Sequence, residues 1–196
     1  MQKRIVKSRG SLKKTAKMVK TFLCEQNRDV LFFDEGRFGL QPIIGRYWGL
    51  RGEKQSVKVI TKYTFFYLYA GISPVTGDSY ILYLPWVNTD IMNLYLQHMA
   101  AAYADKQLLI FMDRAGWHKS KDLLIPTNIR IEHLPAYSPE LNPAEKLWQW
   151  LRQKVCRNKI YDSENDMMNA LTSALRKMSP QRFKQLCHCN YILHHK

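Results

Sequence analysis

The sequence lacks any long hydrophobic run. No apolar stretch reaches the roughly 18 residues that a membrane-spanning helix requires, and the longest candidate, YTFFYLYAGI, is short enough to be a buried strand. Residues 1–20 are basic and contain no apolar core of the kind found in secretory signal peptides. We therefore expect a cytoplasmic protein. With 196 residues, 46% of them hydrophobic, the chain can form one main core.

Cysteine is also scarce. The four cysteines, at positions 24, 156, 187 and 189, do not have the spacing of a disulfide framework, so we expect reduced thiols. The Cys-His-Cys run at 187–189 is followed by His194 and His195, a composition that suggests zinc. Zinc motifs separate their cysteines by at least two residues, however, and here only one intervenes. We do not expect a zinc site.

Acidic residues are few: 16 Asp and Glu stand against 30 Lys and Arg, giving a net charge of +14. Such a charge favours a polyanionic partner, most simply nucleic acid. Residues 1–28 alone hold nine Lys or Arg and one acid, Glu25. We interpret residues 1–28 as a basic helical segment or linker whose Lys13, Lys14 and Lys17 contact DNA, and residues 29–196 as the main domain. A solvated basic helix without a ligand is the alternative.

Apolar patterns predict the order of the elements. Consecutive apolar residues at 29–35 and 106–113 indicate buried strands, and 62–85 reads as strand, turn, strand. Helical patterns cover 141–157, 163–178 and 88–104, where Ile91, Leu94, Tyr95 and Met99 form a stripe. Residues 118–125 predict a short helix, 129–135 a short strand, and 36–58 an irregular hairpin or β-extension. This order indicates an α/β class with a mixed sheet and helices packed on it.

Three acids stand out by their positions. The strands LFFD and LIFMD each end in a carboxylate, Asp34 and Asp113, and ligand sites of α/β sheets gather at such strand ends. If the strands are parallel neighbours, the two carboxylates lie side by side and require a cation or a shared proton. Three prolines then stiffen the loop that delivers Glu145 to the first turn of a helix. Oxygen ligands of this kind suit Mg²⁺ or Mn²⁺, although Glu145 would also be favourable there as a helix-dipole partner.

Other residues near these acids are candidates for supporting roles. Glu35 follows Asp34 and should face the other side of the strand, in a structural or supporting position. His118 lies at the start of the short helix predicted after Asp113, where a lone His is more often a cap or a core residue. A Gly-rich stretch mixes cations with aromatic residues, as DNA-backbone contacts do, although a β-hairpin packed on a partner subunit is almost as plausible. Its residues are Arg46, Trp48, Arg51 and Lys54.

Three segments resemble the Asp-Asp-Glu transposases of the mariner-like insertion-sequence group. They are LFFDEGRFG at 31–39, FMDRAGWHKS at 111–120 and LPAYSPELNPAEKLWQWLR at 134–152. The third is the most specific, because the family pattern reads close to Tyr/Gln-Ser-Pro-acid-Leu-Asn-Pro-x-Glu-x-x-Trp. WGLRGE at 48–53 is similar to a further family segment. The chain departs from the family where Arg114 replaces a common Asn, and in the 31 residues between Asp113 and Glu145.

The resemblance implies an RNase H-like fold with a five-stranded mixed sheet flanked by helices. It also implies that Asp34, Asp113 and Glu145 form a triad that holds two divalent ions, Mg²⁺ or Mn²⁺. The resemblance also implies an active-site role for His118. The implied activity is phosphodiester hydrolysis and strand transfer at transposon DNA ends, by a nucleoid-associated enzyme.

The same resemblance implies particular partners. These are double-stranded DNA, a second copy of the chain in a homodimer, and a separate helix-turn-helix half that recognises transposon ends. Two other functions stay open from the residues alone. One is a catalytically silent DNA-binding or dimerisation remnant of a transposase, and the other is a different RNase H-like nuclease.

Overall fold

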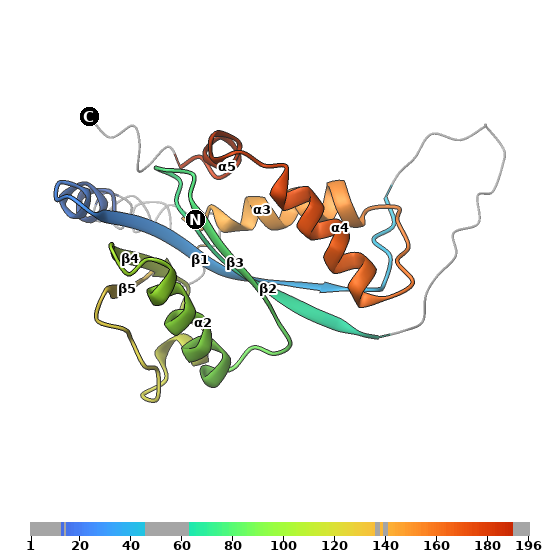
Figure 1. The fold of residues 1–196 in the computed structure, drawn as a ribbon, viewed down its shortest axis with the longest axis horizontal. Helices are drawn as coiled ribbons and strands as arrows, with labels where there is room; N and C mark the ends of the chain where they lie inside the picture. The colour runs from blue at the N-terminus through green and yellow to red at the C-terminus, as the bar shows by residue number, and fades with distance from the viewer. Residues whose placement is uncertain (1–12, 14, 46–62, 136–137, 139–140, 190–196) are drawn as a thin grey trace, which may run out of the picture.

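A five-stranded sheet organises the part of the chain that the computed structural model describes, namely residues 13, 15–45, 63–135, 138 and 141–189. The strand order is β3-β2-β1-β4-β5 (Figure 1). β1 runs antiparallel to β2 and parallel to β4, so the sheet is mixed, as predicted. The strands are β1 (Arg28–Gly39), β2 (Phe65–Ile72), β3 (Ser79–Leu84), β4 (Gln107–Met112) and β5 (Ile129–His133).

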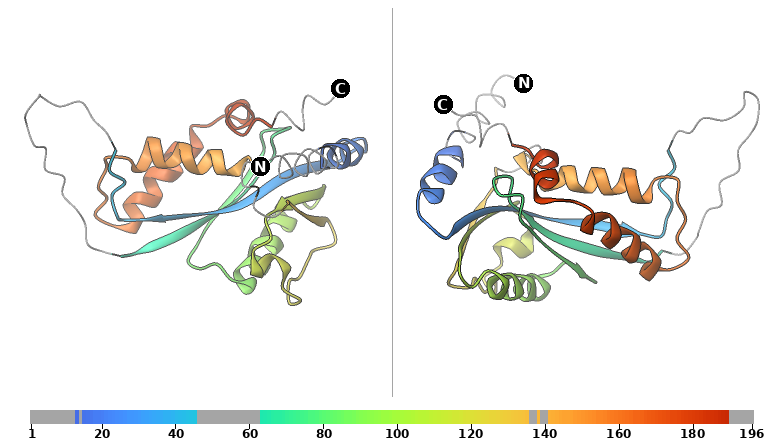
Figure 2. Two further views of the ribbon diagram at one scale, coloured as in Figure 1. Left: turned by 180° about the vertical axis from the view of Figure 1, so that it is seen from behind. Right: turned by 45° about the horizontal axis from the view of Figure 1, so that its top comes forward.

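Helices cover both faces of this sheet. Figure 2 shows α3, α4 and α5 over one face and α2 against the other. The helical elements are α2 (Thr89–Ala102), the 3₁₀ turn η1 (Gly116–Lys119), α3 (Ala144–Leu151), the π-helical turn η3 (Arg152–Cys156), α4 (Glu164–Arg176) and α5 (Pro180–Leu186). Residues 15–23 are also helical. No helix among the described residues is long and apolar enough to cross a membrane.

The alternation of side chains along β1 separates the two layers. Leu31 and Phe33 belong to the core cluster formed with α2, whereas Val30 and Phe32 face the opposite layer. Phe38, further along β1 on that second face, packs with the α3 residues of a third cluster. Because successive strand residues point to opposite faces, neighbouring positions of β1 serve different sides of the domain.

Helix α2 begins where the sequence indicates but buries a slightly different stripe. The side chain of its N-cap, Asn88, accepts a hydrogen bond from the Ile91 backbone N–H. The buried residues are Met92, Tyr95, Leu96 and Met99, and Ile91 is partly buried against the same core cluster. Of the predicted stripe only Leu94 is wrong, because it is 39% exposed. Met92 and Leu96 complete the buried face, since they lie at helical spacing beside Tyr95 and Met99.

Two other predictions need correction. Residues 118–125 do not form a helix: only the 3₁₀ turn η1 is present, and Ser120 to Pro126 are turns and irregular backbone. The first strand does not end at residue 35, because β1 continues to Gly39 through its pairing with β2. The predicted hairpin or β-extension at 36–58 therefore begins as an extension of β1, and its residues 46–58 lie outside the described part of the chain.

The C-terminal elements follow their sequence signals. The Ser163 hydroxyl accepts a hydrogen bond from the Asp166 N–H and caps α4, as predicted. Pro180 stands at the start of α5. The N-terminal helix at 15–23 packs its apolar side on the sheet, where Val19 shares a core cluster with Phe32. The division at residue 28 stays a prediction.

A glycine allows α3 to approach β1 closely. An added Cβ at Gly36 would lie 2.7 Å from Cδ2 of Trp148, below any ordinary contact. Trp148 is 1% exposed and is among the largest buried side chains of the described residues. Gly36 lies two residues after Asp34 on the same face of β1, so the indole of Trp148 covers the strand beside that carboxylate.

Gly36→Ala is expected to lower the free energy of unfolding by about 1–3 kcal/mol, because the new methyl group overpacks the Trp148 site. Urea denaturation monitored by tryptophan fluorescence measures the change. Gly116→Ala is the matched control: nothing lies within 4 Å of its added Cβ, and its effect should stay within about 0.5 kcal/mol. Equal effects of the two substitutions would contradict the close packing of α3 on β1.

Candidate active site

The register of β1 and β4 brings Asp34 and Asp113 to neighbouring positions. Phe32 is paired with Phe111 in the parallel ladder, and each aspartate lies two residues further along its strand. Asp113 directly follows the end of β4, as predicted. Asp34 does not end its strand, because it pairs with Ala70 of β2. The prediction that both strands end in a carboxylate is therefore wrong for β1, but the parallel ladder does end just before Asp34.

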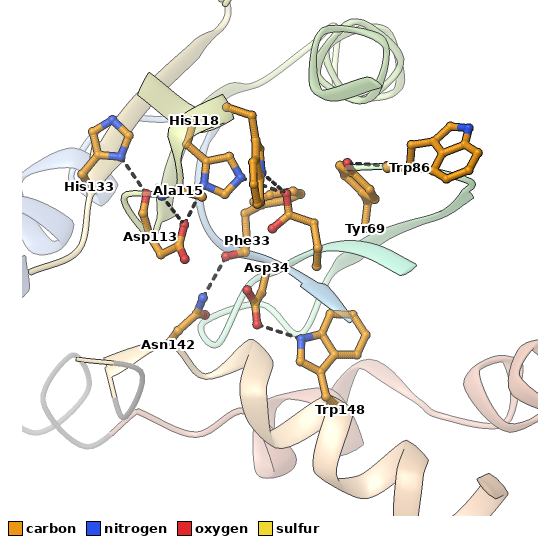
Figure 3. Close-up of polar contacts among 12 residues, drawn as sticks. Phe33, Asp34, Tyr69, Trp86, Asp113, Ala115, His118, His133, Asn142 and Trp148 are labelled. Carbon is orange, nitrogen blue, oxygen red and sulfur yellow. Dashed lines mark hydrogen bonds and ion pairs between the residues drawn. The ribbon is translucent and has the colours of Figure 1, made fainter. Parts of the chain in front are cut away.

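Asp34 is a mostly buried carboxylate with one strong donor. The indole Nε1 of Trp148 donates a hydrogen bond to its Oδ2 at 2.8 Å (Figure 3). Burial, with smaller contributions from the negative charges of Glu145 and Glu35, raises the pKa of Asp34 from 3.8 to about 7 despite that hydrogen bond. A positive charge placed beside this buried carboxylate would favour its anionic form further than the Trp148 hydrogen bond does.

Asp113 is held by the segment that follows β4. Its Oδ1 accepts a hydrogen bond from the Ala115 N–H at 2.9 Å and lies 2.7 Å from Nδ1 of His118 (Figure 3). The hydrogen bond with His118 lowers the pKa of Asp113. Asp113 is therefore anionic at neutral pH, and its side chain remains 60% exposed.

His118 connects Asp113 to Glu35 across the sheet edge. Its Nε2 lies 2.9 Å from Oε1 of Glu35, and the Trp117 indole donates to the same oxygen at 3.0 Å. Burial alone would lower the pKa of His118, but the two carboxylates outweigh burial and raise it to about 9. Glu35 faces the side of β1 opposite to Asp34, as expected for adjacent strand residues.

Asn142 fixes the start of α3 beside Asp34. Its Nδ2 donates to the backbone oxygen of Phe33 at 2.8 Å, and its Oδ1 accepts from the Ala144 N–H at 3.2 Å (Figure 3). The Glu145 N–H bonds to the Asn142 backbone oxygen. Asn142 is 6% exposed, so a buried side chain couples the residue before Asp34 to the first turn that carries Glu145.

The three predicted carboxylates line one hollow of about 580 Å³. Arg114, Lys119 and Asn142 line it too, so the hollow contains positive charge as well as acids. Within the described residues, no three His, Cys, Asp or Glu side chains are close enough together to hold a metal ion. The hydrogen bonds explain this separation, because Asp34 is turned toward Trp148 and Asp113 toward His118.

The predicted DNA-contact residues are only partly described. Lys13 and Lys17 are exposed on the N-terminal helix. The others, Lys14, Arg46, Trp48, Arg51 and Lys54, lie outside the described residues.

Sequence reasoning did not identify the roles of Asn142, Trp117 and the Trp148 N–H. A signal existed for two of them. Asn142 precedes Pro143 at a helix start, where an Asn side chain commonly bonds to the backbone. A buried Trp needs a hydrogen-bond acceptor for its N–H, and Asp34 supplies it for Trp148.

A mixed sheet of this order, with acids where the parallel ladder ends and helices on both faces, is an RNase H-like α/β fold. The fold is similar to chains in the crystal structures of the Mos1 strand transfer complex and of the Mos1 mariner paired end complex with Mn. Both have a TM-score of 0.69 at 16% identity, with coverage of 91% and 90% of this chain and 56% and 57% of the other.

Residues 29–168 match the DDE superfamily endonuclease family, and the chain belongs to that family. It is similar to the uncharacterized protein y4pE/y4sA of Sinorhizobium fredii (strain NBRC 101917 / NGR234), with 32% identity over 119 residues that cover 60% of this chain and 88% of the other. It is 26% identical to the insertion element IS630 uncharacterized 39 kDa protein of Shigella sonnei, over 80% of this chain and 47% of that protein. The chain thus spans about half the length of the IS630 protein.

The raised pKa of Asp34 predicts a specific dependence of stability on pH. The folded protein binds this proton more tightly than the unfolded chain, so the free energy of unfolding falls as pH rises from about 4 to about 7. Asp34→Asn keeps an acceptor for Trp148 but removes the titration. Measured by urea denaturation in EDTA, the variant should gain stability relative to wild type across that window, on the order of 1.4 kcal/mol per pH unit at most.

Asp122→Asn removes an exposed acid and serves as the control, which should follow wild type at every pH. If Asp34→Asn also runs parallel to wild type from pH 4 to pH 8, the carboxyl of Asp34 titrates normally and the account of its burial fails.

Proposed function

We propose that this domain catalyses divalent-metal-dependent phosphodiester hydrolysis and strand transfer at the DNA ends of an insertion element. The observation that carries the proposal is the shared hollow. The β1–β4 register and the docking of α3 give Asp34, Asp113 and Glu145 one common surface in a chain of the DDE superfamily endonuclease family. No protein nucleophile is required, since water and a DNA 3′-hydroxyl are the attacking groups.

The donor set fits divalent cations. Three carboxylates around one hollow offer only oxygen ligands, the kind that Mg²⁺ and Mn²⁺ prefer. When bound, such ions lower the pKa of a water or a 3′-hydroxyl and stabilise the leaving oxygen. Two Mos1 complexes of this fold are named for Mn and Mg, which supports Mg²⁺ or Mn²⁺ here, held by Asp34, Asp113 and Glu145.

The neighbouring residues of the chain have supporting tasks in this proposal. Trp148 covers and orients the Asp34 carboxylate, and Asn142 fixes the helix start that carries Glu145. His118 bonds to Asp113, and Glu35 bonds to His118. Both therefore support Asp113 without lining the hollow themselves. Arg114 and Lys119 do line it and are suited to contact a DNA phosphate.

The proposed partners are double-stranded DNA, a second copy of the chain and a helix-turn-helix half. The net charge of +14 supports DNA. The Mos1 structures of this fold are a strand transfer complex and a paired end complex, which supports an assembly that joins two DNA ends. Because the chain covers 47% of the IS630 protein and 56% of one Mos1 chain, we assign recognition of end sequences to a separate part.

One observation favours a second candidate, a catalytically silent DNA-binding remnant. In the described residues the three acids do not converge into a metal-holding group, and both aspartates have protein hydrogen-bond partners. The two functions differ in what divalent ions do. The active enzyme requires Asp34 and Asp113 to exchange these hydrogen bonds for metal contacts, whereas the silent module keeps them in the presence of Mg²⁺.

Asp34→Asn, Asp113→Asn and Glu145→Gln should each reduce Mg²⁺-dependent DNA cleavage by at least about a hundredfold, because each removes a charge that holds the ions. A nicking assay on labelled DNA carrying insertion-element ends measures this. Circular dichroism and DNA affinity without divalent ions should stay close to wild type.

The control for the triad is Asp122→Asn, an exposed acid that does not line the hollow, and it should cleave like wild type. Retained cleavage in one of the three variants would remove that residue from the proposed triad. Absence of Mg²⁺-dependent cleavage by the wild-type domain, with DNA binding intact, would leave the silent module as the better description.

Replacement of Lys13, Lys14 and Lys17 by Gln should weaken duplex DNA binding and reduce its salt dependence. Each lost phosphate contact lowers the slope of log K against log salt by about 0.9. Fluorescence anisotropy over a salt series measures the slope. An unchanged slope would mean that the N-terminal segment is a solvated basic helix without a DNA contact.

A further inference from the structure

A second hollow lies at the other end of α3, between η3 and α4. This η3–α4 groove has a volume of about 530 Å³ and contains none of the three proposed metal ligands. Trp150 and Val155 line it from the α3–η3 side, and Met178 lines it beyond α4. Four cations complete it: Lys154, Lys159, Lys177 and Arg182.

The charge of the η3–α4 groove is of one sign. All four cations are exposed, and no acid is among the residues that line the groove. Within the described residues none of the four forms an ion pair, and the ammonium of Lys159 donates to the Lys154 backbone oxygen, which keeps the two lysines together. Cations gathered without neutralising acids repel one another, so an anionic ligand stabilises the groove.

The floor of the groove is apolar and aromatic. Trp148 and Trp150 point to different sides of α3: the first is buried beside Asp34, whereas the second is only partly buried and lines the groove. Val155 and Met178 extend this apolar surface. A ligand that fits must therefore present both negative charges and flat apolar faces.

Single-stranded DNA has this combination, because its phosphates and its unpaired base faces are available together. A duplex hides its base faces in the stack and would leave Trp150 unused. We propose that the η3–α4 groove binds a short single-stranded segment of DNA, with one base stacked on Trp150 and the phosphates beside the four cations. This inference rests on the proposed function, since it assigns a place to a strand separated near the cleavage site.

The position of the groove agrees with this role. Lys154 follows Glu145 by nine residues along one continuous helical path, a rise of about 14 Å. That distance spans about four nucleotides at the duplex spacing of roughly 3.4 Å, and fewer in a single strand whose bases are unstacked. Lys146, Gln149 and Gln153, which are exposed on α3 and η3, carry no negative charge. A strand that leaves the active-site hollow along α3 therefore meets no acidic side chain of that helix before it reaches Trp150.

The test is fluorescence anisotropy of a labelled oligo-dT of about 12 nucleotides, with a matched duplex, in EDTA. Trp150→Ala should weaken single-strand binding roughly tenfold, and Trp150→Phe should restore most of it. The matched control is Trp86→Ala, an exposed tryptophan in the loop before α2. Lys154→Gln with Lys177→Gln should reduce the single-strand salt slope by about 1.4, whereas Lys106→Gln with Lys121→Gln, outside the groove, should leave it unchanged.

Three outcomes would overturn the inference. The first is unchanged single-strand binding in the groove variants, and the second is an equal loss for single strand and duplex, which would make the groove a general duplex contact. The third is displacement of oligo-dT from the groove by a poly-Glu peptide of equal charge, which would indicate an acidic protein partner. Cleavage by the wild-type enzyme is measured in parallel. If the wild-type enzyme does not cleave DNA but its groove still binds the single strand, only the proposed catalytic function is contradicted.

Discussion

The parallel pairing of β1 with β4 is the constraint on which the site depends. The Phe32–Phe111 pair ends this ladder, and the two rings stack with centroids 5.1 Å apart. Burial of these residues fixes the register, because a slip of one residue would turn every side chain of a strand to the wrong face. With the register fixed, Asp34 and Asp113 must lie beside each other. Local helix propensity and loop composition could change considerably without moving them.

The docking of α3 adds the third carboxylate and determines the electrostatics of the first. Asn142 bonds to the β1 backbone at Phe33, while Gly36 lets Trp148 settle beside Asp34. The same burial that orients Asp34 raises its pKa to about 7. The ionised carboxylate therefore lowers the stability of the fold at the place proposed for a cation. This pattern, a carboxylate held in an unfavourable place by its surroundings, is typical of functional sites.

The sequence predicts the sheet and its acids better than the details around them. Long apolar runs identify β1 and β4, and the motif around Glu145 identifies its position, because both signals are local. Leu94 was predicted in the α2 stripe but is exposed, whereas Met92 is buried, since both are apolar and only packing on the sheet decides between them. The end of β1 was missed because its extension to Gly39 depends on pairing with β2. The Glu35–His118 contact joins residues 83 positions apart, and no local pattern encodes it.

The central claim is that the three acids converge on a divalent cation. The most direct test is a crystal grown or soaked with Mn²⁺ and examined by anomalous scattering. The account predicts one or two peaks among Asp34, Asp113 and Glu145, with the Asp34 and Asp113 oxygens turned from Trp148 and His118 toward the metal. An absence of Mn²⁺ from this hollow at saturating concentration, with both hydrogen bonds intact, would contradict it.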